Sequence, residues 1–128
     1  MKAYLKNYRQ SPRKVRLVAS LIKGKQVNQA LVNLQYVPKR ASSVIKNLLE
    51  SAVSNAKNNF NIEKENLVVK DIRVDEAPVL KRTSPRARGS AYRIKKRSSN
   101  VSVILAEKTF EEIKKSRINK TNQVNKTN

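Results

Sequence analysis

The feature that most constrains the fold is a strongly basic segment placed between two segments typical of β-strands. The segment KRTSPRARGSAYRIKKR, Lys81 to Arg97, carries eight cationic side chains in seventeen positions and no acidic one. The flanking segments LVVKDIRVDEAPVL and NVSVILAE are rich in β-branched residues, and in the second a valine or leucine recurs at every second position. Because so many like charges cannot enter a core, we expect an antiparallel hairpin whose basic part lies outside it.

This hairpin, over about residues 67–106, is expected to be longer than the domain that carries it. Each strand would span roughly 50 to 60 Å at about 3.3 Å per residue, whereas a domain of about 100 residues has a radius of gyration near 13 Å. Most of the hairpin should therefore project. Two-stranded ribbons are marginally stable in water, and like charges on facing strands repel, so we expect the arm to become ordered in a complex. Pro85 and Gly89 place its turn within SPRARGS.

Three helices are predicted before the hairpin. The first begins with Ser11 as N-cap and Pro12 at the first helical position, and Gly24 ends it. The second follows from the apolar spacing in VNQALVNLQYV, and Pro38 separates it from the third. The third has the clearest helical periodicity, through Ala41, Val44, Ile45, Leu48, Leu49, Ala52, Val53 and Ala56.

These elements predict an α+β fold, with a small antiparallel sheet of about three strands packed on three helices and a long projecting β-hairpin. The segment AYLKNY near the N-terminus supplies the third strand. Residues 1–108 are expected to form one domain. Residues 109–128, a basic and Asn-rich tail, are expected to be disordered.

The charge distribution predicts a polyanionic partner. The chain has 29 Lys and Arg against 9 Asp and Glu, a formal net charge of +20. Repulsion among these charges destabilises the folded chain, so we expect it to be bound to a polyanion. Arg13, Lys14 and Arg16 lie in the first turn of the first helix, where the macrodipole favours anions. Nucleic acid is the first candidate and an anionic membrane the second. Five of the eight arm cations are arginines, which suit bidentate contacts to phosphate.

The sequence does not predict a catalytic site, a metal site or a cofactor site. It has no Cys and no His, so thiol nucleophiles, imidazole bases and the commonest metal ligands are lacking. Asp75 and Glu76 are neighbours on a predicted strand and so point to opposite faces, which leaves no convincing carboxylate pair. We expect no catalytic residue, no metal site and no cofactor. No segment predicts a membrane span, and the N-terminus resembles neither a signal peptide nor an organelle presequence.

Two other classes compete with RNA binding. An architectural DNA-binding protein could insert a basic β-arm into a groove, although the tip offers only Pro85 as an apolar wedge. A membrane-surface protein needs a large exposed apolar helix face, and the third helix needs its apolar stripe for the core. A merely solubilising charged loop is disfavoured because the run is held between two strands.

The segments SPRKVRLVASLIKGK and DEAPVLKRTSPRARGSAYRIKKR resemble the large-subunit ribosomal protein twenty-two family, from about Tyr4 to Glu107. The spacing KR..PRARG.A..I.KR is specific because it fixes cations around one Pro and one Gly. The resemblance implies a structural constituent of the large ribosomal subunit that binds ribosomal RNA and supports assembly. Its hairpin would help line the nascent-peptide exit tunnel, with neighbouring ribosomal proteins and the nascent polypeptide as further partners.

The resemblance also implies which residues contact ribosomal RNA. On the body these are Ser11, Arg13, Lys14 and Arg16, and on the hairpin Lys81, Arg82, Arg86, Arg88, Arg93, Lys95, Lys96 and Arg97. The tip that would face the tunnel consists of Arg86, Ala87, Arg88, Gly89 and Ser90. The chain departs from the family at Ala77, where Gly is usual, and at Ser90, where Arg is usual. The expected location is the ribosome of a bacterium or of an organelle matrix or stroma.

Overall fold

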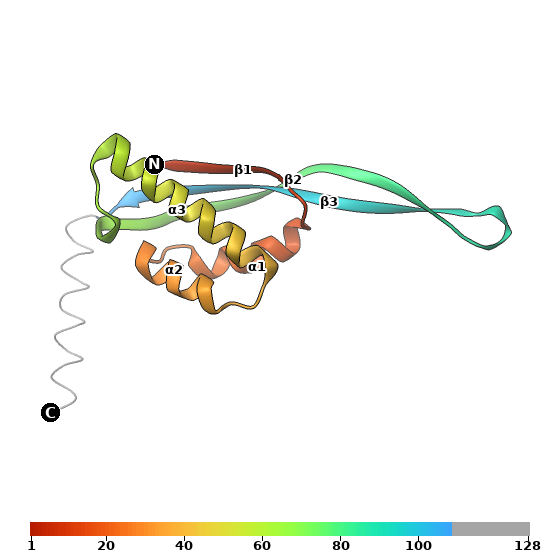
Figure 1. Cartoon of the computed structure of the whole chain (residues 1–128), viewed down its shortest axis with the longest axis horizontal. Helices are drawn as coiled ribbons and strands as arrows, with labels where there is room; N and C mark the ends of the chain where they lie inside the picture. Colours follow the sequence, from red (N-terminus) through yellow and green to blue (C-terminus); the bar gives the residue numbers. More distant parts are fainter. Residues whose placement is uncertain (109–128) are drawn as a thin grey trace, which may run out of the picture.

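The computed structural model describes residues 1–108, which form a three-stranded sheet with three helices packed on one of its faces (Figure 1). The predicted α+β class is confirmed. One strand is followed by the three helices and then by the two long strands of the hairpin. The tail predicted to be disordered, residues 109–128, lies outside the described residues. No helix within residues 1–108 is long and apolar enough to cross a membrane.

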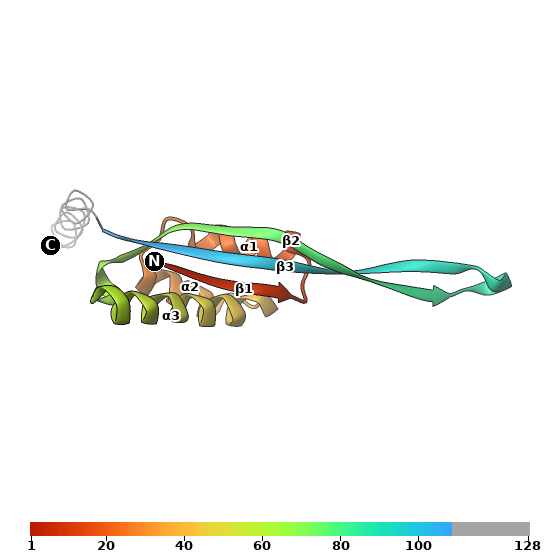
Figure 2. The ribbon, with the colours of Figure 1, turned by 90° about the horizontal axis from the view of Figure 1, so that it is seen from above.

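The sheet is built around the last strand of the described chain. Its order is β1 (Lys2–Tyr8), β3 (Ala91–Glu107) and β2 (Leu67–Pro85), and β3 pairs antiparallel with both neighbours (Figure 2). The strand predicted near the N-terminus is thus confirmed as the third member of the sheet. Because β3 lies in the centre, the same strand belongs both to the core and to the projecting hairpin.

The helices are α1 (Pro12–Ile22), α2 (Val27–Tyr36) and α3 (Arg40–Phe60). Ser11 occupies the predicted N-cap position of α1, but its side chain makes no capping hydrogen bond. Gly24 follows the end of α1 with φ of +75°, a backbone conformation that glycine adopts without strain. Proline and glycine therefore mark the helix boundaries as predicted, whereas the side-chain cap is not formed.

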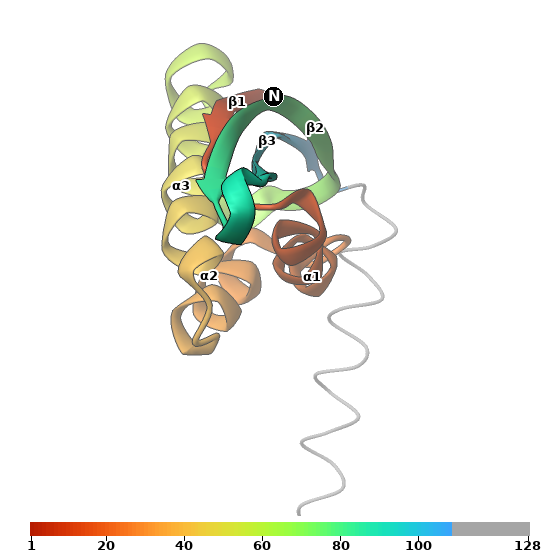
Figure 3. The same cartoon turned by 90° about the vertical axis from the view of Figure 1, so that its right-hand side faces the viewer.

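The core lies between the sheet and the helix layer, where α1 and α3 contact the strands and α2 packs mainly against α3 (Figure 3). Its apolar side chains come from the inward stripe of each helix and from alternate positions of the strands. The largest of the fully buried apolar side chains are Ile22, Ile45, Leu49, Leu67, Val15, Val18, Val27, Val69, Val101 and Val103.

Backbone and side-chain hydrogen bonds attach β2 to the helix layer at the edge of the sheet. The Arg16 guanidinium donates two hydrogen bonds to the Val74 carbonyl oxygen, from Nε at 3.1 Å and from Nη2 at 2.9 Å. The Gly24 N–H donates to the Val69 carbonyl at 2.9 Å, and the Val69 N–H donates to the Lys25 carbonyl at 2.9 Å. Helix α1 and its link to α2 therefore hold the strand from which the hairpin leaves the body.

Only part of the hairpin projects, which differs from the expectation that most of it would. Strand β1 follows β3 as far as the pair Tyr8↔Ser99, and Ala77↔Ser98 is the next rung of the β2–β3 ladder. A register shift interrupts this ladder between Ala77 and Leu80, where the two strands leave the body. We call residues 78–97 the arm; none of them is buried (Figure 1).

Candidate nucleic-acid interface

The arm is a two-stranded ribbon with both faces open to a partner. The β2–β3 pairing resumes at Leu80↔Lys96 and continues to Pro85↔Ala91, and no third strand from residues 1–108 accompanies it there. All eight arm cations predicted to bind RNA lie on this ribbon or at its tip. Because no arm residue is buried in the core, the arm contributes little to the stability of the body, and its side chains are available for contacts outside the chain.

Like charges face one another along the ribbon. Lys81 pairs directly with Lys95, and no acidic residue lies within the arm. Among residues 1–108, Arg97 is the one arm cation with an acidic partner, Glu76, at 3.9 Å. Facing like charges destabilise a pair of strands. An external polyanion that neutralises these side chains would therefore stabilise the ribbon as well as bind it.

The tip closes in a single turn with unusual backbone angles. The Arg86 N–H donates to the Ser90 carbonyl at 2.8 Å, and residues Ala87–Gly89 form one turn of 3-10 helix. Arg88 and Gly89 have φ of 57° and 69°, and the left-handed region is uncommon for residues with a side chain. The Ser90 hydroxyl donates to the Ala87 carbonyl at 2.9 Å. Arg88 is thereby held at the far end of the molecule.

Tyr92 makes a cross-strand contact and is also available for stacking. It pairs with Ser84 in the ladder and is 63% exposed. The Arg86 guanidinium carbon lies 6.0 Å from the centroid of its ring, at the outer limit of a cation–π contact. This contact places a second arginine near the tip.

The predicted cations of the body differ in their contacts within the chain. Arg13 and Lys14 are exposed in the first turn of α1, which contains no acid. Arg16 instead donates two hydrogen bonds to the Val74 carbonyl and so fixes α1 to β2. Nothing in the sequence pattern distinguishes it from its neighbours, because its partner lies 58 residues away.

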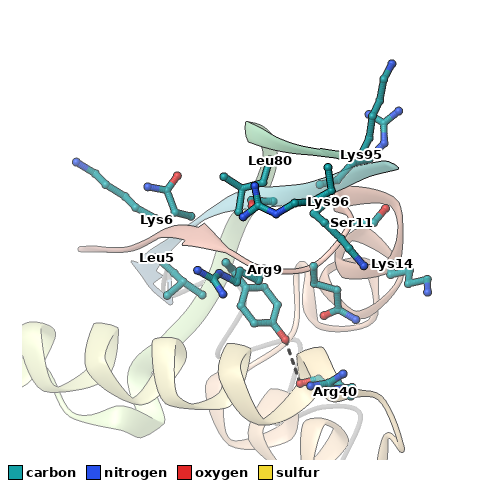
Figure 4. A pocket seen from close by; sticks show the side chains of 15 residues that line it. Leu5, Lys6, Arg9, Ser11, Lys14, Arg40, Leu80, Lys95 and Lys96 are labelled. Carbon is teal, nitrogen blue, oxygen red and sulfur yellow. Dashed lines mark hydrogen bonds between the residues drawn. The ribbon is translucent and has the colours of Figure 1, made fainter. Parts of the chain in front are cut away.

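An open cleft of about 1000 Å³ lies at the base of the arm, where the end of β1 meets the N-terminal ends of α1 and α3 (Figure 4). We call it the basal cleft. Its lining residues are Leu5, Lys6, Asn7, Tyr8, Arg9, Gln10, Ser11, Lys14, Arg40, Leu80, Arg82, Lys95, Lys96, Arg97 and Ser98. The cleft thus joins predicted residues from both groups, body and hairpin.

Eight of the residues that line the basal cleft are cationic and none is acidic. Five of these cations were predicted: Lys14, Arg82, Lys95, Lys96 and Arg97. Three were missed, Lys6, Arg9 and Arg40. The predicted arm residues Lys81, Arg86, Arg88 and Arg93, and the body residues Arg13 and Arg16, lie outside the cleft lining. The first 49 residues contain no acid, which indicated an excess of cations there, but the fold decides which of these cations meet the hairpin.

The shape of the basal cleft follows from the way β1 leaves the sheet. The β1–β3 register shifts between Leu5 and Tyr8, where Asn7 adopts a positive φ of 55°. Its N–H donates to the Asn100 side-chain oxygen at 2.9 Å, which fixes the bend. The Tyr8 hydroxyl donates to the Arg40 carbonyl at 3.3 Å and so ties the end of β1 to α3 (Figure 4).

Among the described residues no acid lines the basal cleft or lies in the arm, although Glu76 pairs with Arg97 at the base of the arm at 3.9 Å. Asp71 on β2 is paired with Lys23 at 2.9 Å and with Arg73 at 2.9 Å. Hydrogen bonds from Lys23 and then Arg73 lower the pKa of Asp71 from 3.8 to about 2. Within the described chain, no group of three or more Asp, Glu, His or Cys side chains is arranged to hold a metal ion.

Comparison with known proteins places these features in context. The model of the family "Ribosomal protein L22p/L17e" matches residues 3–106. A protein of Herpetosiphon aurantiacus named "Large ribosomal subunit protein uL22" is 54% identical over 104 residues, covering 81% of this chain and 92% of that protein. A protein of the same name from Acetivibrio thermocellus is 49% identical over 108 residues, covering 84% of this chain and 86% of its own length.

Proposed function

The chain belongs to the ribosomal protein L22p/L17e family, and on this premise we propose that it binds large-subunit ribosomal RNA through the arm and the basal cleft. It is a structural constituent of the large ribosomal subunit and not an enzyme. The family resemblance carried by the arm motif is confirmed. As a member of this family it has ribosomal RNA and other ribosomal proteins as partners, and it is located in the ribosome.

The observation that carries RNA binding is the convergence of cations in a cleft whose lining contains no acidic residue. The basal cleft brings together eight cationic side chains without one acid, and the cations of the arm continue from it to the tip. RNA phosphates that neutralise them release condensed counterions, which drives association. The arginines add bidentate contacts to phosphate oxygens. Binding then removes the repulsion that destabilises the free arm, so insertion into RNA orders the hairpin and supports assembly.

The tip residues Arg86 to Ser90 are proposed to reach the nascent-peptide exit tunnel, with the nascent polypeptide as a transient partner. A projecting ribbon that buries none of residues 78–97 can pass between RNA segments without giving up any packing against the body. The family resemblance supplies the tunnel as its destination. The two bacterial relatives favour a bacterial or organellar ribosome as the site of action.

Architectural DNA binding is not favoured by the family assignment. A protein that kinks DNA inserts an apolar side chain between base steps. At the turn of the arm, between Ser84 and Ser90, Pro85 is the single bulky apolar residue. A cationic tip of this kind suits phosphate contacts along RNA better than intercalation.

The experiment follows a tagged chain through a density gradient after a high-salt wash. We expect the unmodified chain in the large-subunit peak and Arg86→Glu/Arg88→Glu depleted from mature subunits, with unchanged helix content by circular dichroism. The control Lys57→Glu/Lys64→Glu makes the same change of charge where α3 ends, at the end of the body away from the arm (Figure 1). Recovery of the unmodified chain with the nucleoid, or equal incorporation of both double variants, would contradict the proposal.

A further inference from the structure

We propose that the basal cleft holds one unpaired nucleotide that is extruded from the RNA, with its base on an apolar surface and its phosphates on the cationic rim. This inference rests on the proposed RNA binding and specifies the kind of RNA element that the cleft selects. Sequence-specific RNA recognition favours loops and bulges, because their unstacked bases are accessible. Three features of the cleft distinguish such a nucleotide from a plain run of phosphates.

The first feature is apolar surface within a cationic setting. Leu5, Tyr8 and Leu80 line the basal cleft together with its eight cations. Leu80 is 40% exposed where the arm leaves the body, and the Tyr8 ring is fixed by its hydroxyl contact to the Arg40 carbonyl. An RNA helix presents phosphates and ribose to a protein, and these polar groups do not cover an apolar surface favourably. The flat face of an unstacked base covers it favourably.

The second feature is an unused hydrogen-bond acceptor. Gln10 lines the cleft, and its side-chain oxygen Oε1 is buried without a hydrogen-bond donor among residues 1–108. A buried acceptor without a donor is costly, so a rotation of the Gln10 side chain that brings this oxygen to a donor of the ligand gains affinity. Phosphate diesters have no N–H or O–H group to donate, whereas base amino and imino groups and the ribose 2′-hydroxyl do. A nucleotide is an anionic ligand that also donates hydrogen bonds, and RNA adds the 2′-hydroxyl as a further donor.

The third feature is size and access. About 1000 Å³ is at the upper end of the range of about 300 to 1,000 Å³ that is typical of pockets for small molecules. One nucleotide and the phosphates on either side of it fit such a space, while the cleft remains open to the chain that enters and leaves. The cations from β1, α1, α3 and both arm strands surround it, so phosphates on either side of the extruded base meet positive charge (Figure 4).

The structure offers a matched pair of variants for the test. Leu80 on β2 and Ile94 on β3 are both apolar arm residues and both 40% exposed, but Leu80 lines the basal cleft and Ile94 does not. Leu80→Ser and Ile94→Ser therefore remove similar exposed apolar surface without changing the charge. Large subunits isolated from cells that carry each variant are probed with base-modifying reagents. We expect Leu80→Ser to raise the reactivity of one or a few unpaired ribosomal RNA nucleotides and Ile94→Ser to leave them unchanged.

A second measurement uses the free full-length chain and two synthetic RNA duplexes, identical except that one carries a single bulged 2-aminopurine. We expect roughly tenfold tighter binding to the bulged duplex, the order of effect of one stacked base, with a change in fluorescence of the bulged base. Leu80→Ser should lose the preference and Ile94→Ser should keep it. Equal binding to both duplexes, or identical reactivity patterns in the two variant subunits, would overturn the nucleotide site. Loss of salt-dependent binding to both duplexes would instead refute the proposed RNA binding.

Discussion

Removal of residues 79–93 is expected to leave the body folded and to stabilise it slightly. The deletion shortens the connection between the rung partners Ala77 and Ser98 from twenty residues to five, a length common for hairpin loops. It removes no buried side chain, because residues 78–97 are exposed or only partly buried. It also removes five cations and thereby reduces the self-repulsion of the chain.

The size of the effect follows from the length of the closed loop. Each halving of a flexible loop reduces its closure cost by about 0.6 kcal/mol, so a fourfold shortening contributes about 1 kcal/mol. For a domain of this size, about 1 kcal/mol corresponds to a rise in Tm of roughly 4–8 °C. The cross-strand pairing within the arm does not offset this gain, since a two-stranded ribbon is marginally stable by itself.

Thermal unfolding followed by circular dichroism at a helix-sensitive wavelength measures this change. Leu49→Ala in the full chain is the reference for damage to the core, because Leu49 is 0% exposed and such truncations cost about 2–5 kcal/mol. A deletion variant that loses its cooperative transition, or is destabilised as much as Leu49→Ala, would refute the reasoning. The arm would then be part of the cooperative unit.

Two further predictions concern the attachment of β2 to the helix layer. Arg16→Met should lower the unfolding free energy by about 1–2 kcal/mol, because the Val74 carbonyl on β2 loses its charged hydrogen-bond donor. Urea unfolding measures this change, with Arg13→Met as the control. Equal stability of the two variants would contradict the role of Arg16. The pKa of Asp71 is about 2 in the folded chain, against 3.8 for an unperturbed group. The unfolded state therefore binds more protons as the pH falls. The stabilisation by ionised Asp71 is complete above about pH 4 and is lost as the pH falls towards 2. Between these pH values Asp71→Asn should show a weaker fall in Tm than the unmodified chain; parallel curves would disprove the linkage.

Local signals predicted much of the fold. Pro12 and Gly24 mark the limits of α1 because proline suits a helix start and glycine a left-handed residue after its end. Alternation in β3 identified its buried face, and Val101 and Val103 are 1% and 0% exposed. The length of the projecting part was overestimated because strand periodicity does not say how far β1 and the helices accompany the hairpin.

The candidate site was only partly predictable. The arm cations were evident because they are clustered in one segment of the sequence. Lys6, Arg9 and Arg40 were missed because separate parts of the chain bring them to the basal cleft. The bend at Asn7 that opens the cleft depends on a hydrogen bond to Asn100 across the sheet, and a contact over such a separation leaves no local pattern.

The central position of β3 also determines how the protein responds to mechanical force. A pull on the tip along the arm draws β2 and β3 together, parallel to the strands, while the hydrogen bonds that join β3 to β1 lie across this direction. The load is therefore applied in shear to the β1–β3 ladder, and its hydrogen bonds resist together. A sideways force on the tip would instead bend the arm where it leaves the body, at the register shift between Ala77 and Leu80. The body thus anchors the arm most firmly against extraction along its own axis.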